Sequence, residues 1–330
     1  MAKADYKNVW VLAEVQRGKL SPTAYELLTA GRKLADELHD EKLCAVLLGF
    51  EVESFAQDLI ERGADCVYIC DDVHLEHYID DVYAKVLNSL VKTYKPNKFL
   101  IPATNRGRAL SAKTAVFIGT GLTADATDVQ IHQEDGQLYA TRPTFGGNLM
   151  ATITCAKTRP EMCSLRPMSY ERAVPQPGRK GEIIRFPFDA TKHTSLAKFI
   201  EFIKNKGNEL DLSEAKVIVA GGRGIGKKEG FQLLTQLAER LGGTVAASRP
   251  PVDNGWIDYR YQIGLTGRTV KPKLYIACGI SGQIQHMAGM SGADVIVAIN
   301  KDPNAPIMKT AHYAVEGDLY EVIPAMLESL

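Results

Sequence analysis

The chain has 330 residues, 45% of them hydrophobic, so it can bury a substantial core and is long enough for two domains. Its 39 basic residues equal its 39 acidic residues, and a net charge of zero argues against a nucleic-acid or anionic-membrane partner. A small ligand or a protein partner is the better expectation. No apolar stretch approaches the roughly 20 residues that cross a bilayer, so we expect no integral membrane segment.

The N-terminus and the cysteines predict a cytoplasmic location. The first residues, MAKADYKNVW, include an acidic residue and no long apolar region, so we expect neither a secretory nor a mitochondrial presequence. The six cysteines form no C-x-x-C pair, which predicts reduced and mostly buried thiols. His74 and His77 could share a helix face, but the acidic, surface-like segment around them argues against a metal site.

Strand-like and helix-like stretches alternate through the first third of the chain. Ser21 has the position of an N-cap, with Pro22 at the first helical position. The predicted strands are NVWVLAE, CAVLLG, CVYIC and KFLIPA, and the predicted helices are 21–38, 54–62, 79–94 and 110–118. This alternation predicts a parallel sheet with right-handed crossovers.

The pattern changes after Asp128. GQLYATRP and NLMATITC alternate polar with apolar residues, which predicts antiparallel strands at an edge. Proline, glycine and charged residues then indicate a connector between about residues 175 and 210. Within it the spacing of Leu196, Phe199, Ile200 and Ile203 predicts a short amphipathic helix. We therefore assign residues 1–205 to an N-terminal α/β domain that contacts a partner and residues 206–330 to a second domain.

The second domain repeats the alternation of strands and helices. The predicted strands are KVIVA, GTVAASR, KLYIAC, DVIVAIN and the start of HYAVEG, and the clearest helix is EGFQLLTQLAERLG. These elements predict a doubly wound sheet, whose ligand would lie beyond the carboxyl ends of the strands.

The glycine-rich stretch VIVAGGRGIGKKEGF lies at one such strand end. Lys228 stands where a Walker loop needs Ser or Thr for magnesium, and Lys227 stands where a dinucleotide fingerprint needs its third glycine. Neither motif is therefore complete. Two interpretations of the stretch have equal weight. The glycines could let the backbone approach an anionic ligand at a helix start, or they could simply form a tight turn from strand to helix.

The other strand ends are also polar. Each of these residues alone has a structural explanation, such as a helix cap or a turn. Together, on adjacent strands of one sheet, they predict an extended groove for a dinucleotide. They are Ser248, Arg249, the loop 262–267, Gly279, Ser281, Gly282, His286, Asn300 and Asp302.

Several segments closely resemble the electron-transfer flavoprotein alpha subunit. ASRPPVDNGW, QIGLTG, KLYIACGISGQIQHMAGM and VIVAINKDPNAPI resemble its flavin-binding domain, and NVWVLAE, PATNRGRALSAKTAVFIGTGLTADATDV and RPTFGGNLMATI resemble its N-terminal region. The resemblance spans nearly the whole chain. It implies two domains, with FAD in the second, and a heterodimer with a beta subunit that itself holds FAD or AMP.

The resemblance also implies three residues that tune the flavin. Arg249 would lie against the isoalloxazine and favour its anionic reduced form. The hydroxyl of Thr266 would approach N5. His286 would donate to O2 and stabilise an anionic semiquinone.

Further residues are implied as FAD contacts. They would hold the ring, the ribityl chain, the pyrophosphate and the adenosine, with Arg223 free to pair with phosphate. These residues are Arg223, Ser248, Ile263, Gly264, Leu265, Ser281, Gly282, Gln283, Ile284, Gln285, Asn300, Asp318 and Leu319. Lys227 and Lys228 match no ligand position.

The implied function is transport of electrons from dehydrogenases, such as those of the acyl-CoA type, to an acceptor. The Glu-Gly pair before Asp318 resembles members in which electrons from NADH are bifurcated to ferredoxin. Two alternatives remain: a stand-alone flavin- or nucleotide-dependent oxidoreductase, with His286 as its acid or base, and an ATP-binding regulatory module.

Overall fold

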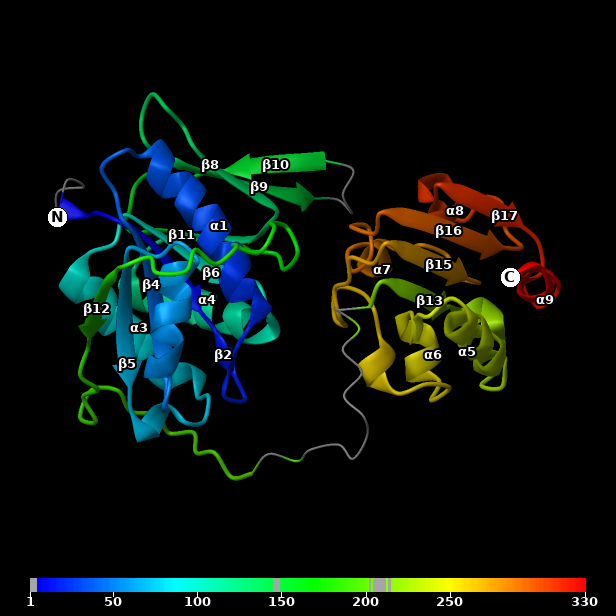
Figure 1. Ribbon diagram of the computed structural model, residues 1–330, viewed down its shortest axis with the longest axis horizontal. Coiled ribbons are helices and arrows are strands. Elements are labelled where there is room, and N and C mark those ends of the chain that lie inside the picture. Colours follow the sequence, from blue (N-terminus) through cyan, green and yellow to red (C-terminus); the bar gives the residue numbers. More distant parts are fainter. Residues whose placement is uncertain (1–4, 145–148, 202, 204–211, 213–214) are drawn as a thin grey trace. The chain divides into compact units, whose positions relative to one another are not determined.

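The computed structural model describes residues 5–144, 149–201, 203, 212 and 215–330. They form two compact units, one ending at Ile203 and the other holding the described residues from 212 onward. The predicted boundary between residues 205 and 206 falls outside the described residues. Each unit is built on a parallel sheet with both faces covered (Figure 1), which confirms the predicted α/β class.

Seven parallel strands form the main sheet of the N-terminal unit, in the order β12-β5-β4-β1-β6-β11-β7. They are β1 (Val9–Ala13), β4 (Leu43–Gly49), β5 (Cys66–Asp71), β6 (Lys98–Pro102), β7 (Leu122–Ala126), β11 (Glu161–Leu165) and β12 (Glu182–Arg185). The four predicted strands are confirmed as β1, β4, β5 and β6. Both faces of these strands are covered, so their sequences are almost continuously apolar and easily recognised.

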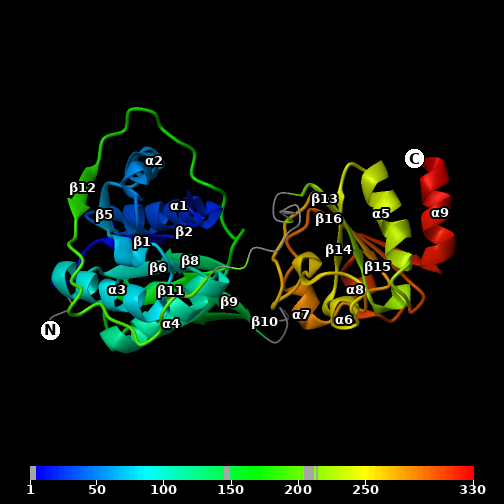
Figure 2. The same cartoon turned by 90° about the horizontal axis from the view of Figure 1, so that it is seen from below.

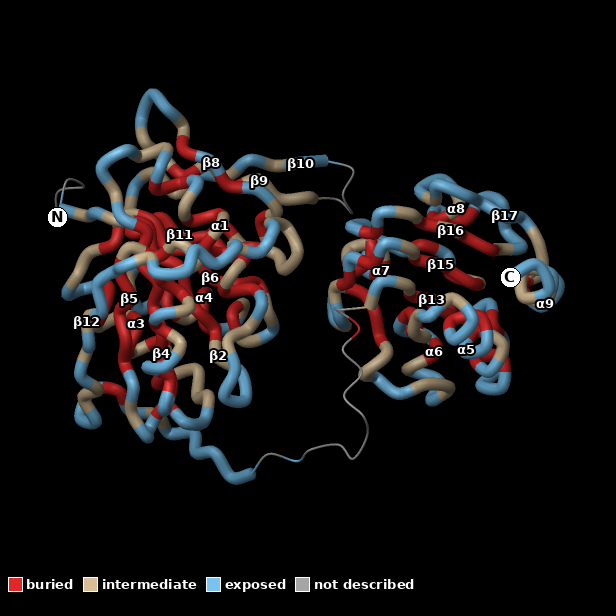
Figure 3. The backbone as a smooth tube through the Cα atoms, viewed as in Figure 1, coloured by how far each residue is buried: buried red, intermediate tan, exposed pale blue. Residues whose placement is uncertain are grey.

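Helices cover both faces of this sheet. α1 (Pro22–Glu37) and α2 (Ala56–Glu61) pack on one face, and α3 (Asp80–Tyr94) and α4 (Asn105–Ile118) on the other. Figure 3 shows the strands as the buried centre between them. Shorter elements are β2 (Val15–Gln16), β3 (Lys19–Leu20) and the 3-10 turns Glu53–Phe55 and Val73–Leu75.

The start of α4 was predicted too late. The helix begins at Asn105 rather than Leu110, because Thr104 caps it: the Thr104 hydroxyl accepts a hydrogen bond from the Gly107 N–H at 3.0 Å. Ser21 does occupy the N-cap position of α1, but its side chain makes no capping hydrogen bond.

A three-stranded antiparallel sheet packs against α1. Its order is β10-β9-β8, with β8 (Asp128–Ile131), β9 (Leu138–Thr144) and β10 (Leu149–Ile153), which confirms the predicted antiparallel strands. A buried ion pair joins it to the main sheet. Glu161 accepts from the Lys98 ammonium at 2.5 Å and from the Leu138 N–H at 2.7 Å.

The predicted connector begins later than expected. β12 lies inside the predicted range of 175–210, yet it pairs with β5 at the sheet edge. The chain beyond it is bound to α3, where Lys85 donates to the Thr194 carbonyl at 2.6 Å and Ser195 donates to Asp81 at 2.9 Å. Residues up to Ser195 therefore belong to the N-terminal unit.

The predicted amphipathic helix of the connector is wrong for the described residues. Residues 195–201 and 203 have no helical structure, and the side chains of Leu196, Ile200 and Ile203 are exposed. A helix this short needs tertiary packing to stabilise it. Phe199 stacks on His77, with 3.6 Å between the ring centroids, while the other three apolar side chains remain exposed. The rest of the segment, at residue 202 and from 204 to 211, lies outside the described residues.

His193, in the chain that follows β12, contacts α3 through a hydrogen bond. Its Nε2 lies 3.0 Å from the Ser89 hydroxyl, and its Nδ1 accepts from the Asp189 N–H at 3.1 Å. The side chain is buried, and burial lowers its pKa from the ordinary value. The hydrogen bond from the Asp189 N–H therefore requires a neutral ring, because a proton on Nδ1 would face this N–H.

We expect His193 to make stability depend on pH. Since its pKa is lower in the folded state, the unfolded state binds more protons, and stability falls as the pH drops below about 6.5. Urea unfolding of wild type and His193→Phe at about pH 7.5 and about pH 5.5 should show the larger loss for wild type. His132→Phe, at a half-exposed histidine, serves as the control. Equal losses in wild type and His193→Phe would contradict this account.

The C-terminal unit contains five parallel strands in the order β14-β13-β15-β16-β17. They are β13 (Val217–Gly221), β14 (Thr244–Ala247), β15 (Leu274–Cys278), β16 (Val295–Asn300) and β17 (Tyr313–Glu316), and all five were predicted. The direction in which strands are added reverses between β13 and β15. In open α/β sheets such a switch point is where ligands bind.

The two faces of this sheet are covered differently. α5 (Gly230–Arg240) and α9 (Leu319–Ser329) pack together on one face (Figure 2). The other face is covered by the loop 262–270 and by the short helices α7 (Ile284–Met287) and α8 (Pro306–Thr310). α6 (Arg249–Asp253) and a 3-10 turn (Tyr259–Tyr261) follow β14. Within the described ranges, no helix has the length and apolarity that crossing a membrane requires.

Candidate functional site

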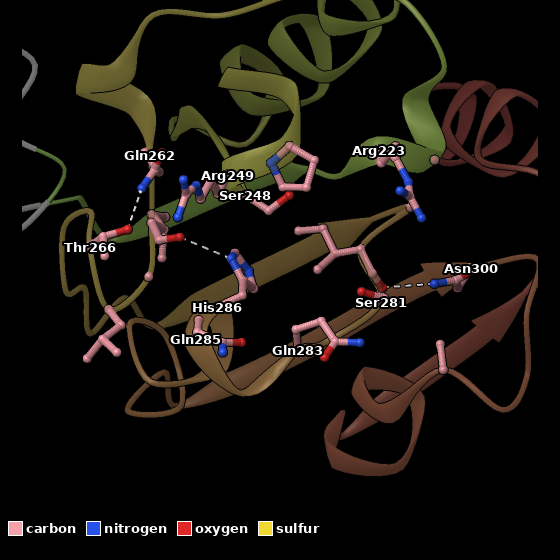
Figure 4. Close-up of a pocket in the computed structure, with 18 of the residues that line it drawn as sticks. Arg223, Ser248, Arg249, Gln262, Thr266, Ser281, Gln283, Gln285, His286 and Asn300 are labelled. Carbon is pink, nitrogen blue, oxygen red and sulfur yellow. Dashed lines mark hydrogen bonds between the residues drawn. The ribbon is translucent and has the colours of Figure 1, made fainter. Parts of the chain in front are cut away.

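A cavity of about 660 Å³ lies at the carboxyl ends of the strands in the C-terminal unit (Figure 4). Its volume is in the usual range for small-molecule sites. Most of the predicted site residues line it: Arg223, Ser248, Arg249, Ile263, Gly264, Leu265, Thr266, Ser281, Gln283, Gln285, His286 and Asn300. The sequence therefore located the cavity, on loops that follow four different strands.

Two glycine loops beside the cavity are in direct backbone contact. The Gly222 N–H donates to the Cys278 carbonyl at 2.9 Å, and the Gly224 N–H donates to the Gly279 carbonyl at 3.0 Å. A Cβ added at Gly222 would lie 2.2 Å from the Gly279 oxygen. The glycines after β13 thus bring this loop against the one after β15, and they place Arg223 at the rim.

We expect Gly222→Ala to disrupt this contact. Because the added methyl group would meet backbone rather than a movable side chain, the loops must separate, at a cost of roughly 1–3 kcal/mol. The free energy of unfolding should fall by about that amount, measured by urea denaturation of the full chain. Gly292→Ala, where the nearest atom is 3.5 Å from the added Cβ, should keep the stability of wild type. Equal stabilities for the two variants would show that the close approach is unnecessary.

The cavity contains two positive side chains and one negative one. Among the described residues that line it, the charged side chains are Arg223, Arg249 and Asp302. The Arg249 Nε pairs with Asp253 at 3.1 Å on an exposed surface, so the other guanidinium N–H groups remain available to a ligand. Arg223 is exposed on a 3-10 turn. The pair favours an anionic ligand.

His286 lines the cavity and has protein partners of its own. Its Nδ1 lies 3.1 Å from the Ile263 carbonyl and its Nε2 lies 3.0 Å from the Tyr275 hydroxyl, so both ring nitrogens have protein partners. Burial lowers its pKa to about 4. The ring is therefore neutral at physiological pH.

The loop 262–267 is arranged around Thr266. The Gln262 amide donates to the Thr266 hydroxyl oxygen at 3.1 Å, and the Tyr259 hydroxyl donates to the Thr266 carbonyl at 2.5 Å. Because the Thr266 hydroxyl accepts from Gln262, its own proton is free for a ligand.

The sequence missed several residues that line the cavity. Most contribute backbone or small apolar surface, for which no residue pattern is distinctive. Gln262, Gly279 and Asp302 were predicted as part of the groove, although not as FAD contacts, and all three line the cavity. The lining residues that the sequence did not predict are Gly224, Pro250, Ile280 and Ala305.

Asn300 lines the cavity and makes two hydrogen bonds to nearby backbone. Its amide nitrogen donates to the Ile280 carbonyl at 2.8 Å, and its amide oxygen accepts from the Asp302 N–H at 3.0 Å. The amide nitrogen therefore connects this loop to the one after β15, and the amide oxygen stabilises the turn that follows β16.

Four predicted residues lie outside the lining: Gly282, Ile284, Asp318 and Leu319. Asp318 caps α9 by accepting from the Tyr320 N–H at 2.9 Å, and it pairs with Lys301 at 2.8 Å. Leu319 is buried in the core between α5 and α9, and Gly282 packs against Ile307. The expected ribose contact of Asp318 would have to compete with the Lys301 pair.

The helix dipole contributes less than expected. The predicted helix start after Ser281 leads into α7, which has only four residues, Ile284–Met287. A helix of one turn sums few peptide dipoles. Individual N–H groups and polar side chains such as Gln283 and Gln285 must therefore provide any contact with an anion here.

Comparison with known proteins assigns both units to one family. Residues 9–191 match the profile described as electron transfer flavoprotein domain, and residues 211–291 match the electron transfer flavoprotein FAD-binding domain. "Protein FixB" of Clostridium saccharobutylicum is 50% identical, covering 98% of this chain and 96% of that protein.

Two further relatives have names that state a role. "Electron transfer flavoprotein subunit alpha" of Thermoanaerobacterium thermosaccharolyticum is 49% identical, over 99% of this chain and 98% of that one. "Acryloyl-CoA reductase electron transfer subunit beta" of Anaerotignum propionicum is 41% identical, over 99% of this chain and 96% of that one.

Proposed function

The chain belongs to the electron transfer flavoprotein alpha-subunit family, and we propose that it binds FAD in the C-terminal cavity and transfers electrons as half of a heterodimer. The observation that carries this proposal is the cavity at the switch point between β13 and β15, with its backbone contact and its two arginines. Such a site suits a dinucleotide that has both a planar ring and phosphates.

The residues present fit FAD in two respects. Arg223 and Arg249 lie apart along the cavity (Figure 4), so one guanidinium can pair with phosphate while the other lies against the ring system. Ile263, Leu265 and Ile280 add apolar surface to the lining. FAD supplies the redox chemistry when bound, and the chain positions it and sets the charge around it.

A carrier fits this cavity better than a stand-alone oxidoreductase. Substrate chemistry would need a general acid or base whose pKa lies near the operating pH. His286 was the candidate, but its ring nitrogens are occupied and burial lowers its pKa to about 4. Asp302, the one carboxylate among the described lining residues, is exposed. The lining therefore favours electron transfer without substrate chemistry.

An ATP-binding regulatory module is also less well supported. Lys227 and Lys228 are exposed and do not line the cavity, and no Ser or Thr takes the magnesium position of a Walker loop. The glycines there are instead explained by their contact with the loop after β15.

The proposed partners are a beta subunit, holding FAD or AMP, and flavin-dependent dehydrogenases in the cytoplasm. The name of the relative from Anaerotignum propionicum, an electron transfer subunit of an acryloyl-CoA reductase, supports a partner that acts on CoA esters. A bifurcating role, from NADH to ferredoxin, would require a second FAD in the beta subunit.

An absorbance spectrum of the heterodimer tests the assignment of FAD. The chain purified with its coexpressed beta subunit should be yellow, and acid should release FAD. A colourless, flavin-free heterodimer would refute the proposed function.

Counting the released flavins separates a simple carrier from a bifurcating one. We expect one FAD per heterodimer from the alpha chain in either case. A second FAD would support bifurcation, and AMP in its place would exclude it.

We expect Arg249→Ala to lower the midpoint potential of the flavin. Removing the positive charge destabilises the reduced, more negative flavin relative to the oxidised one. A spectroscopic redox titration measures the shift. Arg240→Ala, at an exposed arginine at the end of α5, should leave the potential unchanged. An unchanged potential in Arg249→Ala would remove this residue from the tuning of the flavin.

A further inference from the structure

Tyr259 is a surface residue beside the candidate site whose hydroxyl makes one specific contact. It begins the 3-10 turn Tyr259–Tyr261, and 59% of its surface is exposed. It is not among the described residues that line the cavity. Its hydroxyl nevertheless donates to the carbonyl of Thr266, seven positions further along the chain, at 2.5 Å. This hydrogen bond joins a residue outside the cavity to one that lines it.

The backbone on both sides of Tyr259 is held in place. Asp258 caps the 3-10 turn, because its carboxylate accepts from the Arg260 N–H at 2.9 Å. At the other end of the turn, the Gln262 N–H donates to the Tyr259 carbonyl at 2.9 Å. The tyrosine side chain therefore extends from a fixed turn of backbone.

The first half of the loop 262–267 is anchored to neighbouring elements. The Ile263 N–H donates to the carbonyl of Ala247, the last residue of β14, at 2.9 Å. The Leu265 N–H donates to the carbonyl of Gln285, in α7, at 2.7 Å. Neither contact includes Thr266, which follows them in the chain.

Thr266 has anchors of its own, both from the start of the loop region. Its hydroxyl oxygen accepts from the Gln262 amide at 3.1 Å (Figure 4), and its carbonyl accepts from Tyr259. Within the described ranges, the backbone N–H and carbonyl of Thr266 make no other hydrogen bond. The Tyr259 hydroxyl is therefore the anchor of this part of the backbone.

We propose that Tyr259 is a positioning residue that anchors the backbone of Thr266 and thereby fixes the direction of its hydroxyl in the cavity. With the carbonyl held by Tyr259 and the hydroxyl oxygen held by Gln262, the residue is restrained at two points. If the Tyr259 hydroxyl were absent, water would replace it at the carbonyl and the loop would open more often. The consequence for FAD rests on the proposed function, in which the Thr266 hydroxyl contacts the flavin ring.

Hydrogen exchange of the full chain without FAD tests the anchor itself. Tyr259→Phe keeps the ring and removes the donor. We expect residues 262–268 to exchange about two- to tenfold faster, as the loss of one hydrogen bond implies. Tyr313→Phe, at an exposed tyrosine on β17 whose hydroxyl has no hydrogen-bond partner among the described residues, should exchange like wild type. Unchanged exchange in Tyr259→Phe would overturn the proposal.

A double-mutant cycle on the flavin potential tests whether Tyr259 acts through Thr266. In the heterodimer with FAD, Tyr259→Phe should lower the midpoint potential, because a hydrogen bond donated to the ring favours added electrons. The shift should be smaller than that of Thr266→Ala, and it should vanish when Tyr259→Phe is made in the Thr266→Ala chain. No shift, or an equal shift in both backgrounds, would refute the positioning role.

The two readouts separate this inference from the proposed function. If the wild-type heterodimer binds no FAD, the proposed function fails, while the exchange of residues 262–268 still decides whether Tyr259 anchors the loop. If FAD binds and Tyr259→Phe changes neither readout, the proposed function stands and the role of Tyr259 is refuted.

Discussion

The contact between two glycine loops is the constraint on which the candidate site depends. The loop after β13 and the loop after β15 meet backbone to backbone at the switch point of the C-terminal sheet, with Gly222 against Gly279. Side chains at these positions would separate the loops. Because the loops meet, Arg223 lies at the rim of the cavity and Ser281 beside it. The strand order of the sheet places the cavity at the switch point, and the glycines determine how closely the two loops approach each other there.

Positive charge in the cavity comes from exposed arginines, whereas the buried pair His286 and Tyr275 is neutral. His286 and Tyr275 are buried and hydrogen-bonded to each other, and burial disfavours their charged forms. Arg249 and Arg223 remain exposed and keep their charge. A site of this kind stabilises negative charge on a ligand and has no poised acid or base, which is the combination that an electron carrier needs.

The strands of the C-terminal unit could be predicted from the sequence because the patterns that identify them lie within short stretches of the chain. Strands such as β15 are nearly continuous apolar runs, and polar residues follow directly at their carboxyl ends. The prediction failed where tertiary contacts decide. β12 is mostly exposed and becomes a strand only by pairing with β5. The apolar spacing around Ile200 predicted a helix, but three of its four apolar side chains are exposed among the described residues. The hydrogen bonds of His286 could not be predicted either, since Tyr275 and Ile263 meet it only in the folded unit.

The central claim is that FAD binds at the switch point of the C-terminal sheet. Hydrogen exchange, measured by mass spectrometry on the heterodimer with FAD removed and then restored, tests this most directly, because bound ligand suppresses local opening. The account predicts that FAD slows exchange in residues 221–226, 262–267 and 279–287, with little change in α5. Protection confined to other segments, or no protection at all, would contradict it.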